Sequence, residues 1–193
     1  DSGLLGAHQG KPGACLTVGT GVALAWMGLD GSVEKRGGLG FVLGDEGGGA
    51  WLGRRAFQRI ARQLDGLEEA GVDAGVLERF GVGDTLAQVV AFGQQATPDV
   101  FAKYAPLVFE LEQEGLHFGR AVVTEALSEL TTLLAEVPTE LPLALVGGLA
   151  PLYQERFQAL GISTVQAKGD ALDGLWLDAK CPVQTIERWC SVN

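Results

Sequence analysis

The chain has 193 residues, of which 47% are hydrophobic and 20% charged, so it is long and apolar enough to fold as one or two globular domains. Its 14 basic and 24 acidic side chains give a formal net charge of −10, which argues against nucleic acid or an anionic membrane surface as a partner. No apolar run reaches the roughly 18 residues of a membrane span, and no signal peptide is recognisable, so we expect a cytoplasmic protein.

The first forty residues predict a short helix followed by three antiparallel strands. Asp1 is a suitable N-cap and Gly10 a suitable end for a helix over residues 1–10. Short runs separated by glycine-containing turns then predict strands over residues 14–18, 22–26 and 32–36. The third run is polar, which is typical of an edge strand.

The turn between the first two strands is Gly19-Thr20-Gly21. Successive backbone N–H groups of such a tripeptide, with a hydroxyl among them, can form a concave anion-binding nest. An ordinary hairpin turn without a ligand is the other interpretation, and the tripeptide alone does not decide between them.

The segment 37–55, GGLGFVLGDEGGGAWLGRR, is unusual because eight of its nineteen residues are glycine. Glycine allows positive φ angles and close approach of backbone to a ligand, so the lone acidic pair Asp45 and Glu46 is a candidate binding site. The alternative is a surface loop whose acid caps the next helix. That helix is predicted over residues 49–67, with an apolar stripe and with a solvated face that holds Arg54, Arg55, Arg59 and Arg62.

Helices dominate the middle of the chain. Short helices are expected over residues 84–92 and 98–104. The prolines at positions 98 and 106 mark their boundaries. A long helical pattern then runs over residues 107–136, and Gly115 and Gly119 are the positions where it can be interrupted.

A second strand–turn–helix unit follows. The apolar run 142–146 predicts a strand that ends in Gly147-Gly148, and Pro151 opens a helix that reaches about residue 160. A strand end, a diglycine and a helix N-terminus form a place where a ligand can meet backbone. One more strand and one more helix are expected over residues 162–165 and 170–179.

Cysteine and histidine are too scattered to predict a metal site. Cys15, Cys181 and Cys190 form no CxxC pair, and His8 and His117 lack the spacing of metal ligands. The three cysteines are expected to be ordinary thiols.

Four motifs resemble those of a known family when they are taken in chain order. They are Asp1 with the following GAHQGKPG and LTVGTG, then GGLGFVLGDEGGGAWLGRRA, then LALVGGLAPL, and finally GDALDGLWL. Together they are similar to motifs of the BadF/BadG/BcrA/BcrD-type ATPase family, and in particular to its N-acetylglucosamine kinases and bacterial glucosamine kinases.

The resemblance implies a fold and a domain organisation. The fold would be an α/β ribonuclease-H-like domain of the sugar kinase, Hsp70 and actin superfamily, with a mixed five-stranded sheet and helices on both faces. Residues 1–193 would form the C-terminal domain of a sugar kinase, and the N-terminal domain with its phosphate and magnesium loop would be absent from this chain. The isolated chain is therefore expected to be inactive.

The resemblance also implies roles for individual residues. Asp1 would be the general base that takes the proton from the 6-hydroxyl of the sugar as this hydroxyl attacks the γ-phosphate of ATP. The phosphates of ATP would bind at the turn formed by Gly19, Thr20 and Gly21. The adenosine of ATP would bind at Gly147 and Gly148. The amino sugar, N-acetylglucosamine or glucosamine, would be lined by Gly38, Leu39, Gly40, Phe41 and Asp45. The carboxylate in this set would accept hydrogen bonds from the hydroxyls of the sugar.

Three departures from the family pattern leave the choice of sugar open. Leu39 stands where the family often has Trp, and Val22 and Ala23 follow the turn where Ser or Asn is common. Residues 112–116, EQEGL, replace an Ala-x-x-Gly-Asp segment and bring a carboxylate near the expected adenine site.

The expected partners are an amino sugar, ATP with magnesium, the missing N-terminal domain and a second copy of the chain. Two other functions stay open. One is an ATPase activator of a reductase, which would need cysteines for an iron–sulfur cluster in a motif that this chain does not show. The other is a non-catalytic sugar sensor or interaction domain on the same scaffold.

Overall fold

The computed structural model describes residues 2–67, 73 and 75–180 of the chain. Asp1, Cys181 and Cys190 lie outside the described residues. The chain divides into two compact units, which are described here each by itself. Unit 1 comprises Asp1–Val18, Ala23–Gly37 and Leu133–Asn193, and unit 2 comprises Gly19–Val22 and Gly38–Thr132.

A mixed sheet with the strand order β3-β2-β1-β4 forms the centre of unit 1. β2 and β3 are antiparallel, with Ala23 opposite Gly37, whereas β4 runs parallel to β1, with Ala14 opposite Leu143. β3 is exposed along most of its length and carries charged residues, as is usual for an edge strand. The strands that the sequence predicts over these segments are confirmed as β1 (Gly13–Val18), β2 (Val22–Met27), β3 (Val33–Gly37) and β4 (Leu143–Val146).

The expected fifth strand over residues 162–165 is wrong, because within the described residues the sheet has four strands. The segment makes a single bridge, between Val165 and Ala144, in which the Val165 N–H donates to the Leu143 carbonyl at 2.7 Å. Three residues later the N–H of Lys168 donates to the carbonyl of Ala7 in the first helix. The chain thus leaves the sheet edge before a second pair can form.

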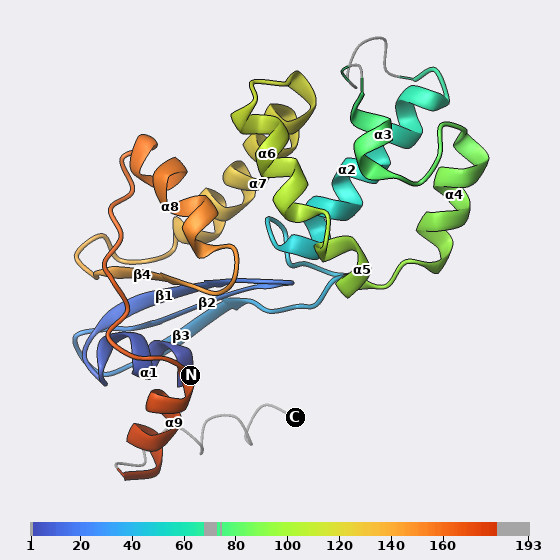
Figure 1. The fold of residues 1–193 in the computed structure, drawn as a ribbon. Coiled ribbons are helices and arrows are strands. Elements are labelled where there is room, and N and C mark those ends of the chain that lie inside the picture. The colour runs from blue at the N-terminus through green and yellow to red at the C-terminus, as the bar shows by residue number, and fades with distance from the viewer. Residues whose placement is uncertain (1, 68–72, 74, 181–193) are drawn as a thin grey trace. The chain divides into compact units, whose positions relative to one another are not determined.

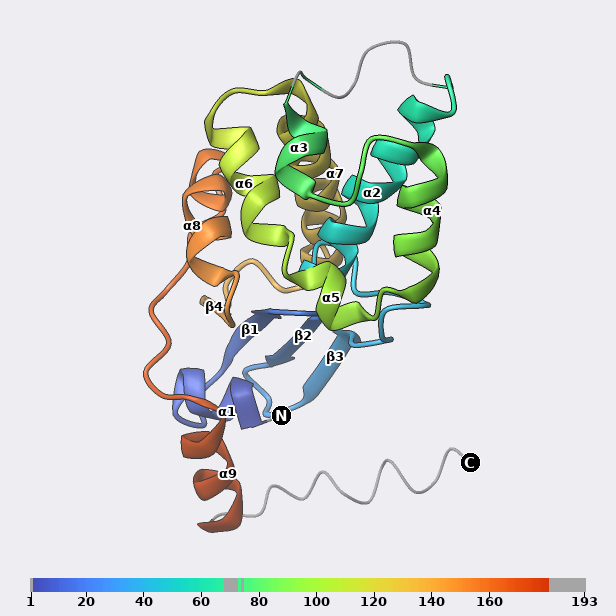
Figure 2. The ribbon, with the colours of Figure 1, turned by 45° about the vertical axis from the view of Figure 1, so that its right-hand side comes forward.

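Helices cover both faces of this sheet, as expected (Figures 1 and 2). α1 (Ser2–His8) packs on one face, where Leu4, Leu5 and Ala7 form an apolar cluster with Cys15 and residues of the neighbouring strands. α8 (Ala150–Ala159) lies on the other face and buries Tyr153 and Phe157. The predicted helices over residues 1–10 and 151–160 are therefore confirmed within the described residues.

α9 (Ala171–Lys180) packs against α1 at unusually short range. A Cβ atom on Gly6 would overlap the carbonyl oxygen of Asp170, and one on Gly174 would overlap the carbonyl oxygen of Ser2. The two backbones can approach this closely only because both positions lack a side chain.

Unit 2 is helical and is organised around α2 (Gly49–Leu64). α2 contacts α4, α5 and α6, and Phe57 at its centre packs against the rings of Phe80, Phe92, Phe101 and Tyr104. The other helices of this unit are α3 (Val76–Phe80), α4 (Leu86–Gln95), α5 (Pro98–Ala102), α6 (Ala105–Gln113) and α7 (His117–Leu134), whose last two residues belong to unit 1.

The long helical pattern over residues 107–136 is two helices. Gly115 has a positive φ of 81° and ends α6, because its N–H and that of Leu116 turn back to the carbonyls of Glu112 and Leu111. Gly119, by contrast, lies buried inside α7, where a Cβ atom would overlap the backbone N of Glu112. One glycine therefore breaks the helix, and the other lets α7 approach α6.

The described helices contain none that is long and apolar enough to cross a membrane. Over the same residues, no three His, Cys, Asp or Glu side chains gather as a metal site would require.

Candidate functional site

The turn Gly19-Thr20-Gly21 is anchored to the first residues of α2. The Gly19 carbonyl accepts a hydrogen bond from the N–H of Gly49 at 2.8 Å, and the Thr20 carbonyl accepts one from the N–H of Ala50 at 2.9 Å. Two backbone donors of the first turn of α2, which have no partner inside the helix, are thus satisfied by the GTG turn.

These two bonds also fix where the N–H groups of the turn point. In a trans peptide the C=O and the following N–H point in opposite directions, and the described residues contain no cis peptide. The N–H groups of Thr20 and Gly21 therefore point away from α2. Neither has a hydrogen-bond partner within the described part of the chain, and the Thr20 side chain is exposed. Two successive N–H groups that point the same way in a turn can bind an anion.

Val22 joins the turn to the glycine-rich segment. Its N–H donates to Oδ1 of Asp45 at 3.2 Å, and its carbonyl accepts from the N–H of Gly38 at 2.7 Å. A Cβ atom on Gly21 would overlap Oδ2 of Asp45, so the carboxylate lies directly against the turn. The structure thus brings together the turn and two of the residues that the sequence predicts for sugar binding.

Asp45 adopts a left-handed backbone conformation, with φ of 64°, and is half-buried. Its carbonyl accepts from the N–H of Gly48, and Gly48 is the N-cap of α2 without any side-chain capping bond. The interpretation of Asp45 as a helix cap is therefore wrong. Its exposed neighbour Glu46 has no described side-chain contact to the turn.

Arg54 holds Phe41 in place. No pattern in the sequence predicts this contact. The Arg54 guanidinium lies 4.6 Å from the centroid of the Phe41 ring, and Nη1 donates to the Phe41 carbonyl at 3.1 Å. The same ring stacks on Phe101 with 5.8 Å between centroids. The expected solvated position of Arg54 is thus wrong, because the cation packs on an aromatic face.

The rest of this loop presents apolar side chains to solvent. Leu39, Val42 and Leu43 are 65%, 83% and 77% exposed. Leu39 and Gly40 therefore lie exposed on the loop that Phe41 anchors.

Two other arginines of α2 are paired with Glu125 of α7. Arg55 Nε lies 2.5 Å from Glu125 Oε2 and its Nη2 lies 3.0 Å from Oε1, while Arg59 Nη1 donates to Oε1 at 3.1 Å. The hydrogen bond from Arg55 lowers the pKa of Glu125 below its ordinary value; partial burial opposes this shift, and the charges of both arginines add to it. The expectation of a solvated face is wrong for these arginines too.

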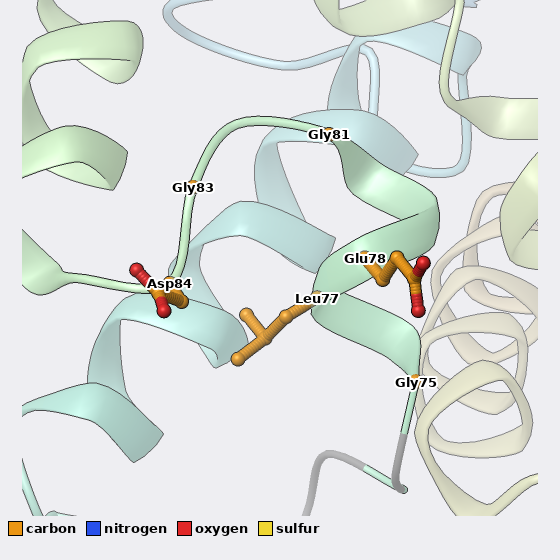
Figure 3. Close-up of a pocket in the computed structure, with 6 residues that line it drawn as sticks. All are labelled: Gly75, Leu77, Glu78, Gly81, Gly83 and Asp84. Atoms are coloured by element: carbon orange, nitrogen blue, oxygen red, sulfur yellow. The ribbon is translucent and has the colours of Figure 1, made fainter.

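Two surface hollows of unit 2 contain none of the predicted site residues. One of about 510 Å³ is shown in Figure 3, where the carboxylates of Glu78 and Asp84 lie apart on either side of Leu77 and do not converge. The other, of about 380 Å³, is lined by Trp51, Arg55, Gln58, Glu125, Ser128 and Glu129.

The diglycine lies at the end of β4 in unit 1. Gly147 has φ of 104° and packs against the Val18 carbonyl, which also accepts the N–H of Leu149 at 3.1 Å. Gly148 is exposed, and a Cβ atom there would meet nothing within 4 Å. Gly147 thus serves close backbone packing, and Gly148 is open to a ligand. Asp1 lies outside the described residues.

Comparisons with known proteins point to sugar kinases. No protein-family model matches the chain. Over 106 residues, 54% of this chain, it is 30% identical to glucosamine kinase GspK of Vibrio cholerae and spans 35% of that protein. A provisionally named N-acetylglucosamine kinase of Chromobacterium violaceum has a similar structure, with a TM-score of 0.79, 34% identity and coverage of 91% of this chain and 62% of that chain.

A second provisionally named N-acetylglucosamine kinase, from Porphyromonas gingivalis, is similar in fold alone. The TM-score is 0.66 at 20% identity, with coverage of 94% of this chain and 65% of that chain. The chain thus spans about a third of the curated relative and less than two thirds of the two solved chains.

Proposed function

We propose that this chain is the C-terminal domain of an ATP-dependent hexosamine kinase that phosphorylates N-acetylglucosamine or glucosamine at the 6-hydroxyl. Membership of the BadF/BadG/BcrA/BcrD-type family, the ribonuclease-H-like fold and a cytoplasmic location belong to this proposal. The names of the similar proteins support the reaction class. The observation that carries the proposal is the GTG turn: two of its N–H groups point away from α2, and Asp45 and Gly38 are hydrogen-bonded to Val22, the residue that follows the turn.

The turn would hold the phosphates of ATP. Phosphoryl transfer depends mainly on positioning and on stabilising the charge of the transferred group, so preorganised backbone donors are a suitable contribution. The N–H groups of Thr20 and Gly21 and the exposed Thr20 hydroxyl supply such donors. They suit a chain with a net charge of −10, which has no general attraction for phosphate.

Magnesium would neutralise charge on the ATP phosphates. The described residues contain no cluster of three His, Cys, Asp or Glu side chains. In the proposal the metal belongs with the nucleotide and the N-terminal domain. Gly147 and Gly148 would lie against the adenosine.

The sugar would bind beside the turn, along Gly38, Leu39, Gly40 and Phe41, with hydroxyls donating to Asp45. A buried carboxylate selects a sugar because an epimer without the matching hydroxyl leaves the acid unpaired. Asp1 would accept the proton from the 6-hydroxyl while that oxygen forms its bond to the γ-phosphorus and the bond from phosphorus to the leaving ADP oxygen breaks.

The role of Asp1 is tested in the full-length protein with the variant Asp1→Asn. We expect turnover to fall by about 10²-fold or more, the usual contribution of general acid–base catalysis, while sugar affinity stays within about twofold. A coupled ADP-release assay measures turnover, and calorimetry with each amino sugar measures affinity. Near-normal turnover of the variant would remove Asp1 from the mechanism.

A second candidate function is a non-catalytic sugar-binding domain on the same scaffold. It is favoured by the exposed apolar loop at Leu39, Val42 and Leu43 and by the non-polar residues Val22 and Ala23 after the turn. Calorimetric binding of an amino sugar by full-length protein that releases no ADP would select this function. The reductase-activator alternative finds no support in Cys15, which is buried in the core of unit 1, where burial raises the pKa of its thiol.

A further inference from the structure

Asp45 makes a contact that its proposed role in sugar binding does not require. Its Oδ1 accepts the Val22 N–H at 3.2 Å, and its Oδ2 lies against Gly21, inside the GTG turn itself. Within the described part of the chain, this is the one side-chain hydrogen bond made to residues 19–22.

The backbone conformation at position 45 is consistent with a side chain that is held by its contacts. Left-handed φ angles are easiest for glycine, and an L-residue pays roughly 1 kcal/mol or more to adopt them. The segment 37–55 contains eight glycines, yet its left-handed position 45, with φ of 64°, is an aspartate. The strain is offset by what the side chain binds.

Two sets of hydrogen bonds hold the turn. One set fixes the orientation of its N–H groups, and the other fixes its last peptide group. The bonds from Gly49 and Ala50 to the turn carbonyls set the side to which the Thr20 and Gly21 N–H groups point. The bond from Val22 to Asp45 fixes the end of the turn, and with it the Gly21–Val22 peptide. Without that bond Gly21, which has no side chain, can rotate more freely.

We propose that Asp45 is a positioning residue for phosphate binding: one carboxylate oxygen fixes the Val22 amide at the end of the GTG turn and leaves the other for the sugar. This inference rests on the proposed kinase function. It makes one side chain a mechanical link between the sugar and the phosphate-binding backbone, so that occupancy of the sugar site and order in the turn depend on the same residue.

Three variants of the full-length protein separate this role from simple sugar contact. Asp45→Asn keeps an oxygen acceptor and tolerates the left-handed backbone, but it loses the charge. Asp45→Gly keeps the backbone conformation and removes the acceptor. Glu129→Gln changes an exposed carboxylate of α7, for which no contact with the turn is described, and serves as the control.

Amide hydrogen exchange of the peptide that contains Val22, together with the KM values for ATP and for the amino sugar, gives the readouts. For Asp45→Gly we expect about tenfold faster exchange and a KM for ATP raised by about tenfold or more. For Asp45→Asn we expect normal exchange and a KM for ATP within about twofold of the original, with a raised KM for the sugar. Glu129→Gln should leave all three quantities unchanged.

Unchanged exchange at Val22 in Asp45→Gly would overturn the proposal, and so would equal effects of the glycine and asparagine variants on the KM for ATP. If the original protein phosphorylates neither amino sugar, the kinase function fails and ATP positioning fails with it. The exchange measurement would then still decide whether Asp45 holds the turn, so the two failures are distinguishable.

Discussion

Glu125 of α7 accepts hydrogen bonds from Arg55 and Arg59 of α2, and the three side chains lie partly buried between the two helices. The sequence could place these arginines only off the apolar stripe of α2, because a helical period describes one helix at a time. Their partner is 70 residues further along the chain than Arg55, and no local pattern encodes that distance. The contact between Arg54 and Phe41 was missed for the same reason.

Replacement of Glu125 by Gln should lower the free energy of unfolding by about 1 kcal/mol or less at pH 7, since the pair is only partly buried. The folded-state pKa of Glu125 lies below its ordinary value of 4.5, so its contribution is present above that value and is lost as the pH falls through the folded pKa. The difference between the original chain and Glu125→Gln should therefore shrink in acid.

Urea unfolding at pH 7 and at about pH 3 measures this difference, with Glu129→Gln as control because Glu129 lines the same hollow but accepts no described arginine bond. A difference that stays the same at both pH values would contradict the assignment of the stabilisation to the carboxylate charge.

At the scale of elements, the sequence predicts the helices and strands that local patterns encode. It fails where tertiary contacts determine the structure of a segment. The glycine turns and apolar runs locate β1, β2, β3 and β4, and the expected amphipathic helix is α2 (Gly49–Leu64). Residues 162–165 have the composition of a strand, but the bond from Lys168 to α1 draws the chain away from the sheet. The helix α3 spans only five residues and had no periodic pattern to reveal it.

The close packing of α1 on α9 leads to a prediction about two glycines of the same helix. Gly6→Ala should destabilise the chain by about 1–3 kcal/mol, because the new methyl group overlaps the Asp170 carbonyl and forces the helices apart. Gly3→Ala is the matched control, since its methyl group would meet only Thr17 Oγ1 at 3.9 Å. Alanine favours a helix over glycine, so this variant should keep or gain stability.

Thermal unfolding of both variants checks the expectation. Equal melting temperatures for Gly6→Ala and Gly3→Ala would show that the two helices are not in the close contact described.

At the scale of the whole molecule, part of the candidate site could be predicted from the sequence. The GTG turn, Gly38 and Asp45 were predicted from motifs, and the structure shows how Val22 joins them. The motifs could not reveal that the carboxylate binds backbone, because this depends on the path of the chain between residues 22 and 45. The similar solved chains are longer than this one, which covers 62% and 65% of them.

The isolated 193-residue chain is therefore expected to show no ATP-dependent phosphorylation of glucosamine or N-acetylglucosamine, because half of the phosphate and metal site would lie in the N-terminal domain. A coupled kinase assay with the chain alone and with the full-length protein makes the comparison. Robust turnover by the chain alone would show that it needs no second domain.

The two bonds between the start of α2 and the carbonyls of the GTG turn have an electrostatic consequence. Each peptide group that accepts a hydrogen bond at its oxygen becomes a stronger donor at its nitrogen, by roughly 10–30% in condensed-phase estimates. The peptide units that end in the Thr20 and Gly21 N–H groups both accept such bonds from Gly49 and Ala50. The positive end of the α2 dipole thus acts through two peptide groups. The helix can stabilise an anion bound at the turn without contacting it.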